Sequence, residues 1–175
     1  HSLRLLNDIM KENQIFVVVA QKDIAVENPK EEDLYRYGTL AKIVKVFTMP
    51  DKSRSVIVQG LERVEIHKLT KMDPYYHGIV QRLQDSEDDS IESVAIRERL
   101  KESFKEIVDM SDYLSKDNIT MMMNAVDDGN LADVVISMLS ISVEEKQHIL
   151  EQFNINKRLA EVAVILAQEL EKAKI

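Results

Sequence analysis

The side chains that could carry out chemistry are scattered along the chain. The four histidines, at positions 1, 67, 77 and 148, never stand four residues apart, and no H-E-x-x-H motif occurs. With 4 glycines and no cysteine, the chain has neither a glycine-rich phosphate loop nor a thiol nucleophile, and no serine lies in a G-x-S-x-G elbow. We therefore predict no catalytic, cofactor-binding or metal-binding residue, and no enzymatic activity of the chain itself. A dispersed active site that leaves no local motif is the alternative.

Two groups of side chains suit binding better than catalysis. Tyrosines stand in pairs near the ends of predicted strands, where a ring with a polar tip can hold a peptide. Three consecutive methionines form a soft cluster of the kind that adaptable peptide-binding surfaces use. Packing at strand ends and between helices is the alternative interpretation of both groups. The candidate substrate contacts are Tyr35, Tyr37, Tyr75, Tyr76, Met121, Met122 and Met123.

Composition and charge indicate two folding units. The chain has 175 residues, of which 45% are apolar and 31% charged, with a net charge of −8 that argues against a nucleic-acid surface. Residues 1–83 carry 13 basic and 11 acidic side chains, whereas residues 84–175 carry 10 and 20. We predict a β-rich unit over 1–84, an acidic linker over 85–90 and a helical unit over 91–175. No apolar stretch approaches the ~20 residues that span a membrane.

The first half has the pattern of strands behind one leading helix. Apolar residues at helical spacing over 3–10 precede strands over 15–20, 38–47, 54–66 and 75–83. The continuous apolar run 15–20 is typical of a strand buried on both faces. Lys42 and Lys45 among apolar neighbours indicate a curved or bulged strand, and Gly60 indicates a bend. These signs predict a small β-barrel-like sheet.

The second half has helical periodicity throughout. Capping pairs are expected at Asp89 with Glu92, at Asn130 with Asp133 and at Ser142 with Glu145, and a Met-rich helix begins near residue 118. The last helix, whose middle over 162–167 is apolar all round, is expected to be the central helix of a bundle. The predicted fold class is therefore α+β, with a β-barrel-like lobe followed by an all-α bundle.

Four passages resemble a known family. Residues 33–43 and 50–64 are similar to the "G-T-x-A-x-I" strand, the "P-D-G" turn and the "V-x-V-x-G-x-x-R" strand of the N-terminal domain of Lon, the ATP-dependent protease. Residues 127–133 resemble its "D-D-x-x-x-L-A-D" helix start, and 145–159 its "K-Q-x-x-L-E…x-x-R-L" passage. The turn has Lys52 where the family commonly has glycine. The family's opening "P-L-R-x-x-V-x-x-P" strand is absent, so we expect an incomplete barrel of the PUA-like type.

This resemblance implies a function that composition does not reveal. The expected role is substrate recognition and assembly within a cytoplasmic, homo-hexameric, ATP-dependent serine endopeptidase that degrades misfolded and regulatory proteins. Expected partners are unfolded or degron-bearing proteins, with no membrane and no nucleic acid. The family's ATPase module, which uses ATP and magnesium, and its Ser–Lys dyad lie outside the matched region, so no such residue is assigned here. A stand-alone Lon-domain binding module without protease activity is the alternative.

Overall fold

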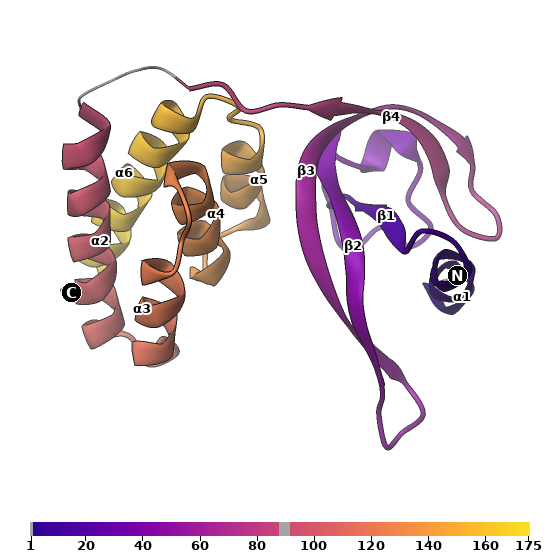
Figure 1. Cartoon of the computed structure of the whole chain (residues 1–175), viewed down its shortest axis with the longest axis horizontal. Coiled ribbons are helices and arrows are strands. Elements are labelled where there is room, and N and C mark those ends of the chain that lie inside the picture. The colour runs from indigo at the N-terminus through magenta and orange to yellow at the C-terminus, as the bar shows by residue number, and fades with distance from the viewer. Residues whose placement is uncertain (1, 88–91) are drawn as a thin grey trace. The chain divides into compact units, whose positions relative to one another are not determined.

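A computed structural model of the chain describes residues 2–87 and 92–175 (Figure 1). The chain divides into two compact units, residues 1–84 and residues 85–175. We call them the β unit, which holds the sheet and helix α1, and the helical unit, which holds helices α2 to α6. An antiparallel sheet together with segregated helices confirms the α+β class.

The β unit is an open, curled sheet. Its elements are α1 (Ser2–Lys11), β1 (Ile15–Val18), the 3-10 helix η1 (Glu31–Asp33), β2 (Tyr37–Thr48), β3 (Arg54–Lys71) and β4 (His77–Leu83). The strands pair in the order β1-β2-β3-β4, all antiparallel. Within residues 2–87, β1 pairs only with β2 and β4 only with β3, so the sheet does not close. The predicted barrel-like lobe is therefore not a closed barrel in this part of the chain, because closure requires the first and last strands to pair. An open sheet agrees with the incomplete barrel that the sequence led us to expect.

Bulges bend the long central strands. The register between β2 and β3 shifts between Leu40 and Ala41 and again between Ile43 and Lys45, which confirms the expected bulge. An extra residue in one strand increases the local twist and curls the sheet. Gly60 lies opposite Ala41, within the continuous strand β3. Its φ is negative, and an added Cβ would meet only the Thr39 methyl, at 3.3 Å, so this glycine is less constrained than predicted.

Helix α1 covers one face of the sheet. Its apolar side chains Leu6 and Ile9 are buried against Ile43 of β2. Half-buried Phe16, Val46 and Val56 surround this contact, so the apolar side of an amphipathic helix meets the apolar side of the strands. Strand β1 is an edge strand whose side chains are half-buried or exposed. The prediction that its apolar run is buried on both faces is therefore wrong.

The helical unit packs five helices around its own apolar core. They are α2 (Glu92–Met110), α3 (Lys116–Met123), α4 (Asp128–Met138), α5 (Val143–Leu150) and α6 (Ile155–Ala173). Side chains cap several of them: the Ser142 hydroxyl accepts from the Glu145 amide, as predicted, and the Asp127 carboxylate accepts from the Asn130 amide. Helix α4 thus begins before Asn130, three residues earlier than expected. The predicted pair involving Asp89 lies outside the described residues.

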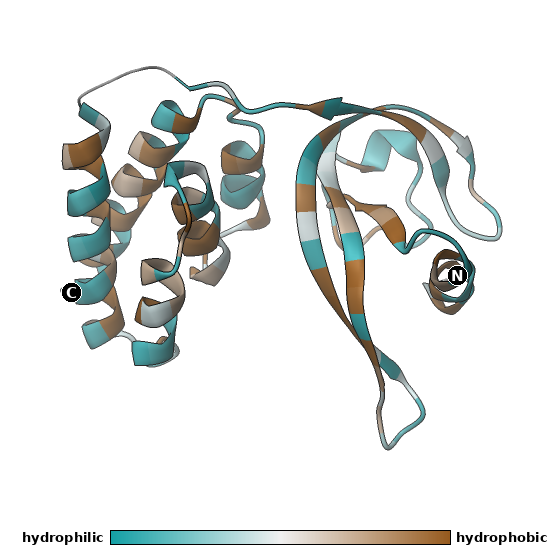
Figure 2. Cartoon of the chain, in the orientation of Figure 1, coloured by the Kyte–Doolittle hydropathy of each residue, from teal (hydrophilic) through white to brown (hydrophobic). Residues whose placement is uncertain are grey.

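Helix α6 is amphipathic. Leu159, Val162 and Leu166 are fully buried, whereas Val164 has 56% of its surface exposed. The apolar stripe and the polar back of the helix are visible in Figure 2. The middle of α6 is therefore apolar all round but exposed on one side, so other helices do not surround it as they would the expected central helix of a bundle. None of the helices in the described ranges is long and apolar enough to cross a membrane.

The start of the predicted linker is held by the helical unit. The Ser86 amide donates to the Phe153 carbonyl, and the Ile155 amide donates to the Ser86 carbonyl, both over 2.8 Å. Asp85 binds a side chain of α6, as described below. These two residues are therefore anchored to the helical unit, and positions 88–90 of the predicted linker lie outside the described residues.

Candidate functional site

The tyrosine that follows η1 borders a cavity in the β unit. The cavity has a volume of about 260 Å³, and three apolar residues, Leu34, Ile66 and Leu69, belong to its lining. The backbone amide of Tyr35 donates to the Ala20 carbonyl over 3.0 Å, which fixes the loop. The complete lining is Lys22, Glu31, Leu34, Tyr35, Arg36, Ile66, His67 and Leu69. A lining that combines apolar and charged residues can hold an apolar side chain of a peptide.

The carboxylate of Glu65, on β3, is bound by several neighbouring side chains. Arg36 Nε lies 2.7 Å from one Glu65 oxygen, and His67 Nε2 lies 3.2 Å from the other. Tyr37, which pairs with Glu65 across β2 and β3, also donates its hydroxyl to this carboxylate. The Arg36 hydrogen bond, followed by that of Tyr37, lowers the pKa of Glu65, and Glu65 in turn raises the pKa of Arg36. Tyr37 thus has a structural partner in the folded chain.

The lowered pKa of Glu65 predicts a pH-dependent stability. A carboxyl group with a lowered folded-state pKa stabilises the fold above its unfolded-state pKa, about 4.3, and loses this contribution as pH falls through the folded value. We expect Glu65→Gln to be less stable than the unmodified chain at pH 7, with the difference vanishing as the solution is acidified below that range. Urea unfolding followed by tyrosine fluorescence measures it, because four of the five tyrosines lie in the β unit.

Glu27→Gln is the matched control. This exposed carboxylate has no hydrogen bond or ion pair within the described part of the chain, so its variant should follow the unmodified chain at every pH. A Glu65→Gln difference that persists unchanged at low pH would contradict the assigned role of the ion pair.

The other two candidate tyrosines fasten the turn between β3 and β4. The Tyr75 hydroxyl donates to the Asp8 carboxylate of α1 over 2.7 Å, and Asp8 raises the pKa of Tyr75 through this bond. The Tyr75 ring stacks on His77 with 4.7 Å between centroids. The Tyr76 hydroxyl donates to the Pro29 carbonyl. The structure gives both hydroxyls intramolecular partners, although Tyr76 keeps 38% of its surface exposed.

The three methionines of α3 divide between core and surface. Met122 is completely buried in the core of the helical unit, whereas Met121 and Met123 are 53% and 51% exposed. Successive residues of a helix point about 100° apart, so three neighbours cannot share one face. The predicted three-residue binding cluster is therefore corrected to two separate exposed methionines.

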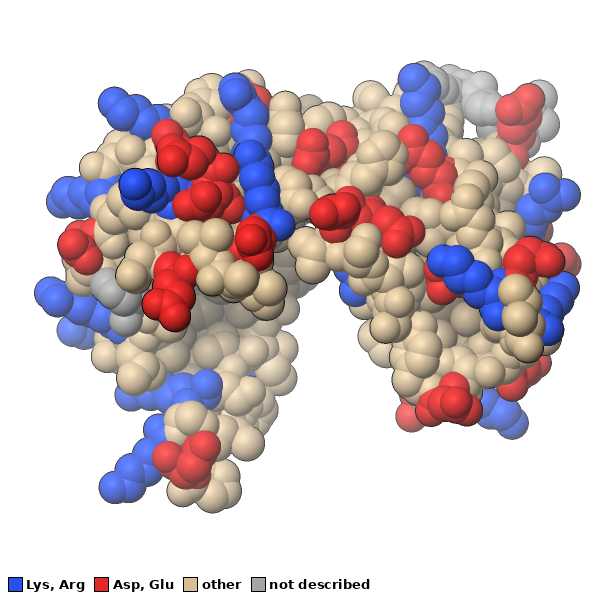
Figure 3. Space-filling model, turned by 180° about the vertical axis from the view of Figure 1, so that it is seen from behind, with Lys and Arg blue, Asp and Glu red and all other residues tan. Residues whose placement is uncertain are grey.

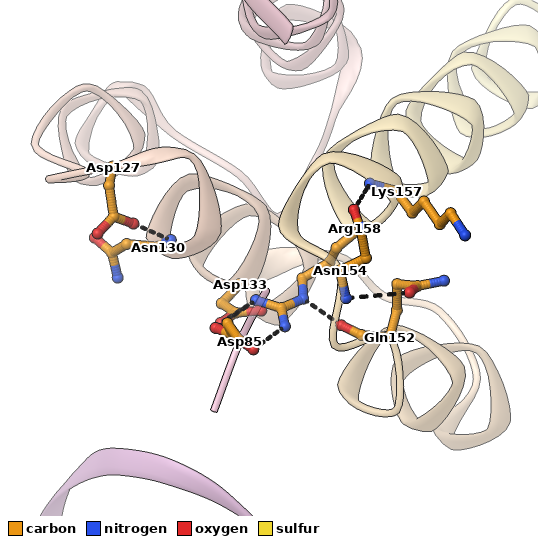
Figure 4. Close-up of polar contacts among 8 residues, drawn as sticks. All are labelled: Asp85, Asp127, Asn130, Asp133, Gln152, Asn154, Lys157 and Arg158. Atoms are coloured by element: carbon orange, nitrogen blue, oxygen red, sulfur yellow. Dashed lines mark hydrogen bonds and ion pairs between the residues drawn. The ribbon is translucent and has the colours of Figure 1, made fainter. Parts of the chain in front are cut away.

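A fully buried arginine, Arg158, is the centre of a polar cluster in the helical unit (Figure 4). Arg158 Nη2 lies 2.6 Å from an Asp85 oxygen, and Nη1 lies 3.6 Å from Asp133 of α4. Its Nε donates to the Gln152 carbonyl over 2.9 Å. The two carboxylates compensate the charge of Arg158, and each of its three side-chain nitrogens has a partner. The arginine therefore links α4, α6 and the segment that contains Asp85. We assign it a structural role.

Sequence reasoning missed the exposed apolar side chains of the β2–β3 hairpin. The signal was present in the sequence: the predicted strands carry apolar residues on both faces, and a single helix can cover only one of them. Beyond the part that α1 covers, large apolar residues remain 38% to 61% exposed: Val44, Phe47, Met49, Ile57, Val58 and Leu61. The hairpin protrudes at the lower left of Figure 3. Exposed apolar side chains gathered on one element are typical of an interaction surface.

No group of three metal-ligating side chains lies close enough to hold an ion within residues 2–87 and 92–175.

The model of one protein family, described as "ATP-dependent protease La (LON) substrate-binding domain", matches residues 1–168. The chain belongs to this family. The resemblance stated from the sequence motifs is thereby confirmed, and with it the description of the chain as a Lon substrate-binding domain.

Curated Lon proteases resemble nearly the whole chain. The Lon protease of Syntrophomonas wolfei is 35% identical over 170 residues, which are 97% of this chain and 21% of that protein. The Lon protease of Aquifex aeolicus is 33% identical over 173 residues, 97% of this chain and 22% of that protein. The chain thus spans about a fifth of the length of these relatives.

Solved Lon N-terminal domains share the fold. The Lon N-terminal domain protein of Xanthomonas campestris superposes with a TM-score of 0.65 at 16% identity, covering 93% of this chain and 82% of that one. The N-terminal domain of the Mycobacterium avium complex Lon protease gives a TM-score of 0.62 at 17% identity, covering 89% and 90%.

Proposed function

We propose that the chain holds unfolded protein segments for a Lon protease, as its substrate-recognition part. The observation that carries the proposal is the family match over residues 1–168. The exposed apolar side chains and the cavity beside Tyr35 support it, because unfolded proteins display the apolar groups that native proteins bury. Among the sequence candidates, Tyr35 and the half-exposed Tyr76, Met121 and Met123 are the proposed contacts, since Met122 has no accessible surface.

Membership in the family supports further proposals about the complete protein. We infer that the serine nucleophile for proteolysis and the residues that bind ATP and magnesium belong to parts of the protein outside these 175 residues. We also propose a hexameric assembly in the cytoplasm, in which this part captures substrates and contributes to assembly. A PUA-like barrel is the corresponding proposal for the complete β unit. Six weak copies would then bind one substrate with an avidity that a single copy lacks.

Comparison of a folded and an unfolded form of one ligand tests the proposal. A small domain in its native form and a point variant that is unfolded in buffer are labelled, and each is titrated with the chain by fluorescence anisotropy. We expect weak binding of the unfolded form and none of the native form. Tyr35→Ser should weaken this binding, whereas Tyr113→Ser, which changes a tyrosine of the helical unit, should not. Equal binding of both forms would contradict the proposal.

A further inference from the structure

The distal β2–β3 hairpin combines exposed apolar surface with positive charge. Between residues 42 and 59 the chain has four basic side chains and one acidic side chain, Asp51. The Asp51 carboxylate accepts hydrogen bonds from the Ser53 amide and hydroxyl of the turn. Lys42, Lys45 and Lys52 form no ion pair within the part of the chain that the structure describes. The hairpin therefore carries positive charges that no side chain of the β unit balances.

Strand register places some of these groups on the face that α1 leaves open. Val46 and Val56 are paired and point toward α1, so their neighbours along each strand point away from it. Lys45 is paired with Ile57 on the open face, and Phe47 lies two residues farther along the same strand. We call Lys45, Phe47 and Ile57 the hairpin patch.

A cation–π contact organises this patch. The Lys45 amine lies 4.9 Å from the centre of the Phe47 ring, so the ammonium is held over an apolar group instead of extending freely into water. Ile57 is 49% exposed beside it, and Val44, the residue added by the bulge, is 61% exposed. An apolar side chain of a ligand can therefore contact Ile57 and the ring while a neighbouring carboxylate meets the amine.

We propose that the hairpin patch selects unfolded segments in which apolar side chains are flanked by aspartate or glutamate. The inference rests on the proposed function and adds a charge preference to it. Charge complementarity supplies the argument, because each exposed ion pair changes a binding constant by up to about fivefold. Lys45 lies within the hairpin patch, and Lys42 and Lys52 add two more positive charges to the same hairpin. The whole chain is acidic, with a net charge of −8, so any preference for acidic segments must come from a local positive surface such as this one.

Two labelled peptides of 20 residues test the preference. They share the same apolar residues and differ in four flanking positions, which are glutamate in one and lysine in the other. We expect the unmodified chain to bind the acidic peptide about tenfold more tightly at low salt, with the difference shrinking in concentrated salt as the charges are screened. Anisotropy titrations give both dissociation constants.

Charge variants locate the effect. The triple variant Lys42→Gln, Lys45→Gln and Lys52→Gln should abolish the preference. Its matched control, Lys11→Gln, Lys68→Gln and Lys71→Gln, removes the same charge elsewhere in the β unit, away from the cavity beside Tyr35, and should retain the preference. A preference that survives the first triple variant, or that both triple variants lose equally, would overturn the assignment to the hairpin.

Apolar variants test the contact surface. Ile57→Ser should weaken binding of both peptides at least fivefold, whereas Ile24→Ser, at a residue 94% exposed in a loop, should not. Because Ile57 is half exposed, its variant is expected to stay folded, which circular dichroism checks. If the unmodified chain binds both peptides equally, the charge preference fails while the proposed function stands. If it binds neither, both fail. Self-association abolished by Ile57→Ser would assign the patch to a second copy and overturn the proposal.

Discussion

Replacement of Asp85 by alanine is expected to destabilise the helical unit by about 3 kcal/mol. Arg158 has no accessible surface in the folded chain, so its guanidinium depends on protein groups for its hydrogen bonds. The partners that the guanidinium keeps in this variant are the Asp133 carboxylate, 3.6 Å away, and the Gln152 carbonyl. The cost is therefore that of a buried charge left without its principal partner, which exceeds the value of an ordinary surface ion pair.

A second variant separates this explanation from simple loss of packing. Asp85→Ala combined with Arg158→Met removes the buried charge together with its partner, so we expect the double variant to be more stable than Asp85→Ala alone. Urea unfolding followed by far-ultraviolet circular dichroism reports on the helices. Asp112→Ala, at an exposed position, is the control and should change stability by less than about 0.5 kcal/mol. A double variant less stable than Asp85→Ala would contradict the argument.

Replacement of Gly38 by alanine is expected to destabilise the β unit by about 2–3 kcal/mol. A Cβ atom at Gly38 would lie 2.5 Å from the Val18 carbonyl oxygen and 3.2 Å from the Val19 side chain. The nearer atom belongs to the backbone of β1, which pairs with β2 at this point, so relief requires the two strands to separate. The effect arises from close approach, because φ at Gly38 is not positive.

Gly60→Ala is the matched control for this prediction. It adds the same methyl group to the partner strand, where only the Thr39 methyl lies within contact, at 3.3 Å. We expect its cost to stay below about 1 kcal/mol. Tyrosine fluorescence during urea unfolding measures both variants. Equal losses at Gly38 and Gly60 would show that close approach of β1 is not the cause.

Local patterns in the sequence predicted most elements of the fold. Alternation over 54–59 marked β3, and Ser142 with Glu145 marked the start of α5, because strand pairing and helix capping each involve neighbouring positions. Open edges could not be predicted in the same way. Whether β1 is an edge strand depends on which strands pair with it, and the composition of 15–20 does not contain that information.

The candidate site was predicted only in part. Paired tyrosines indicated strand ends, but Tyr75 and Tyr76 bind Asp8 and Pro29, which are distant in the sequence. The rotation along α3 separates Met122 from its neighbours, a fact that the run of three methionines conceals. The hairpin patch was missed because its exposure depends on which face of the sheet α1 covers, and no local pattern in the strands encodes that choice.

The bonds of Asp85 and Ser86 determine where the chain can be divided. A fragment that begins at residue 91, at the boundary suggested by composition, would lack the carboxylate that neutralises Arg158 and the backbone partners of Phe153 and Ile155. Strand β4 ends at Leu83, so Gln84 is the single residue between the last strand and the first anchor of the helices. Expressed fragments, circular permutants and domain exchanges should therefore be divided at Gln84. A boundary placed after Ser86 would remove the groups that bind Arg158, Phe153 and Ile155 from the helical unit.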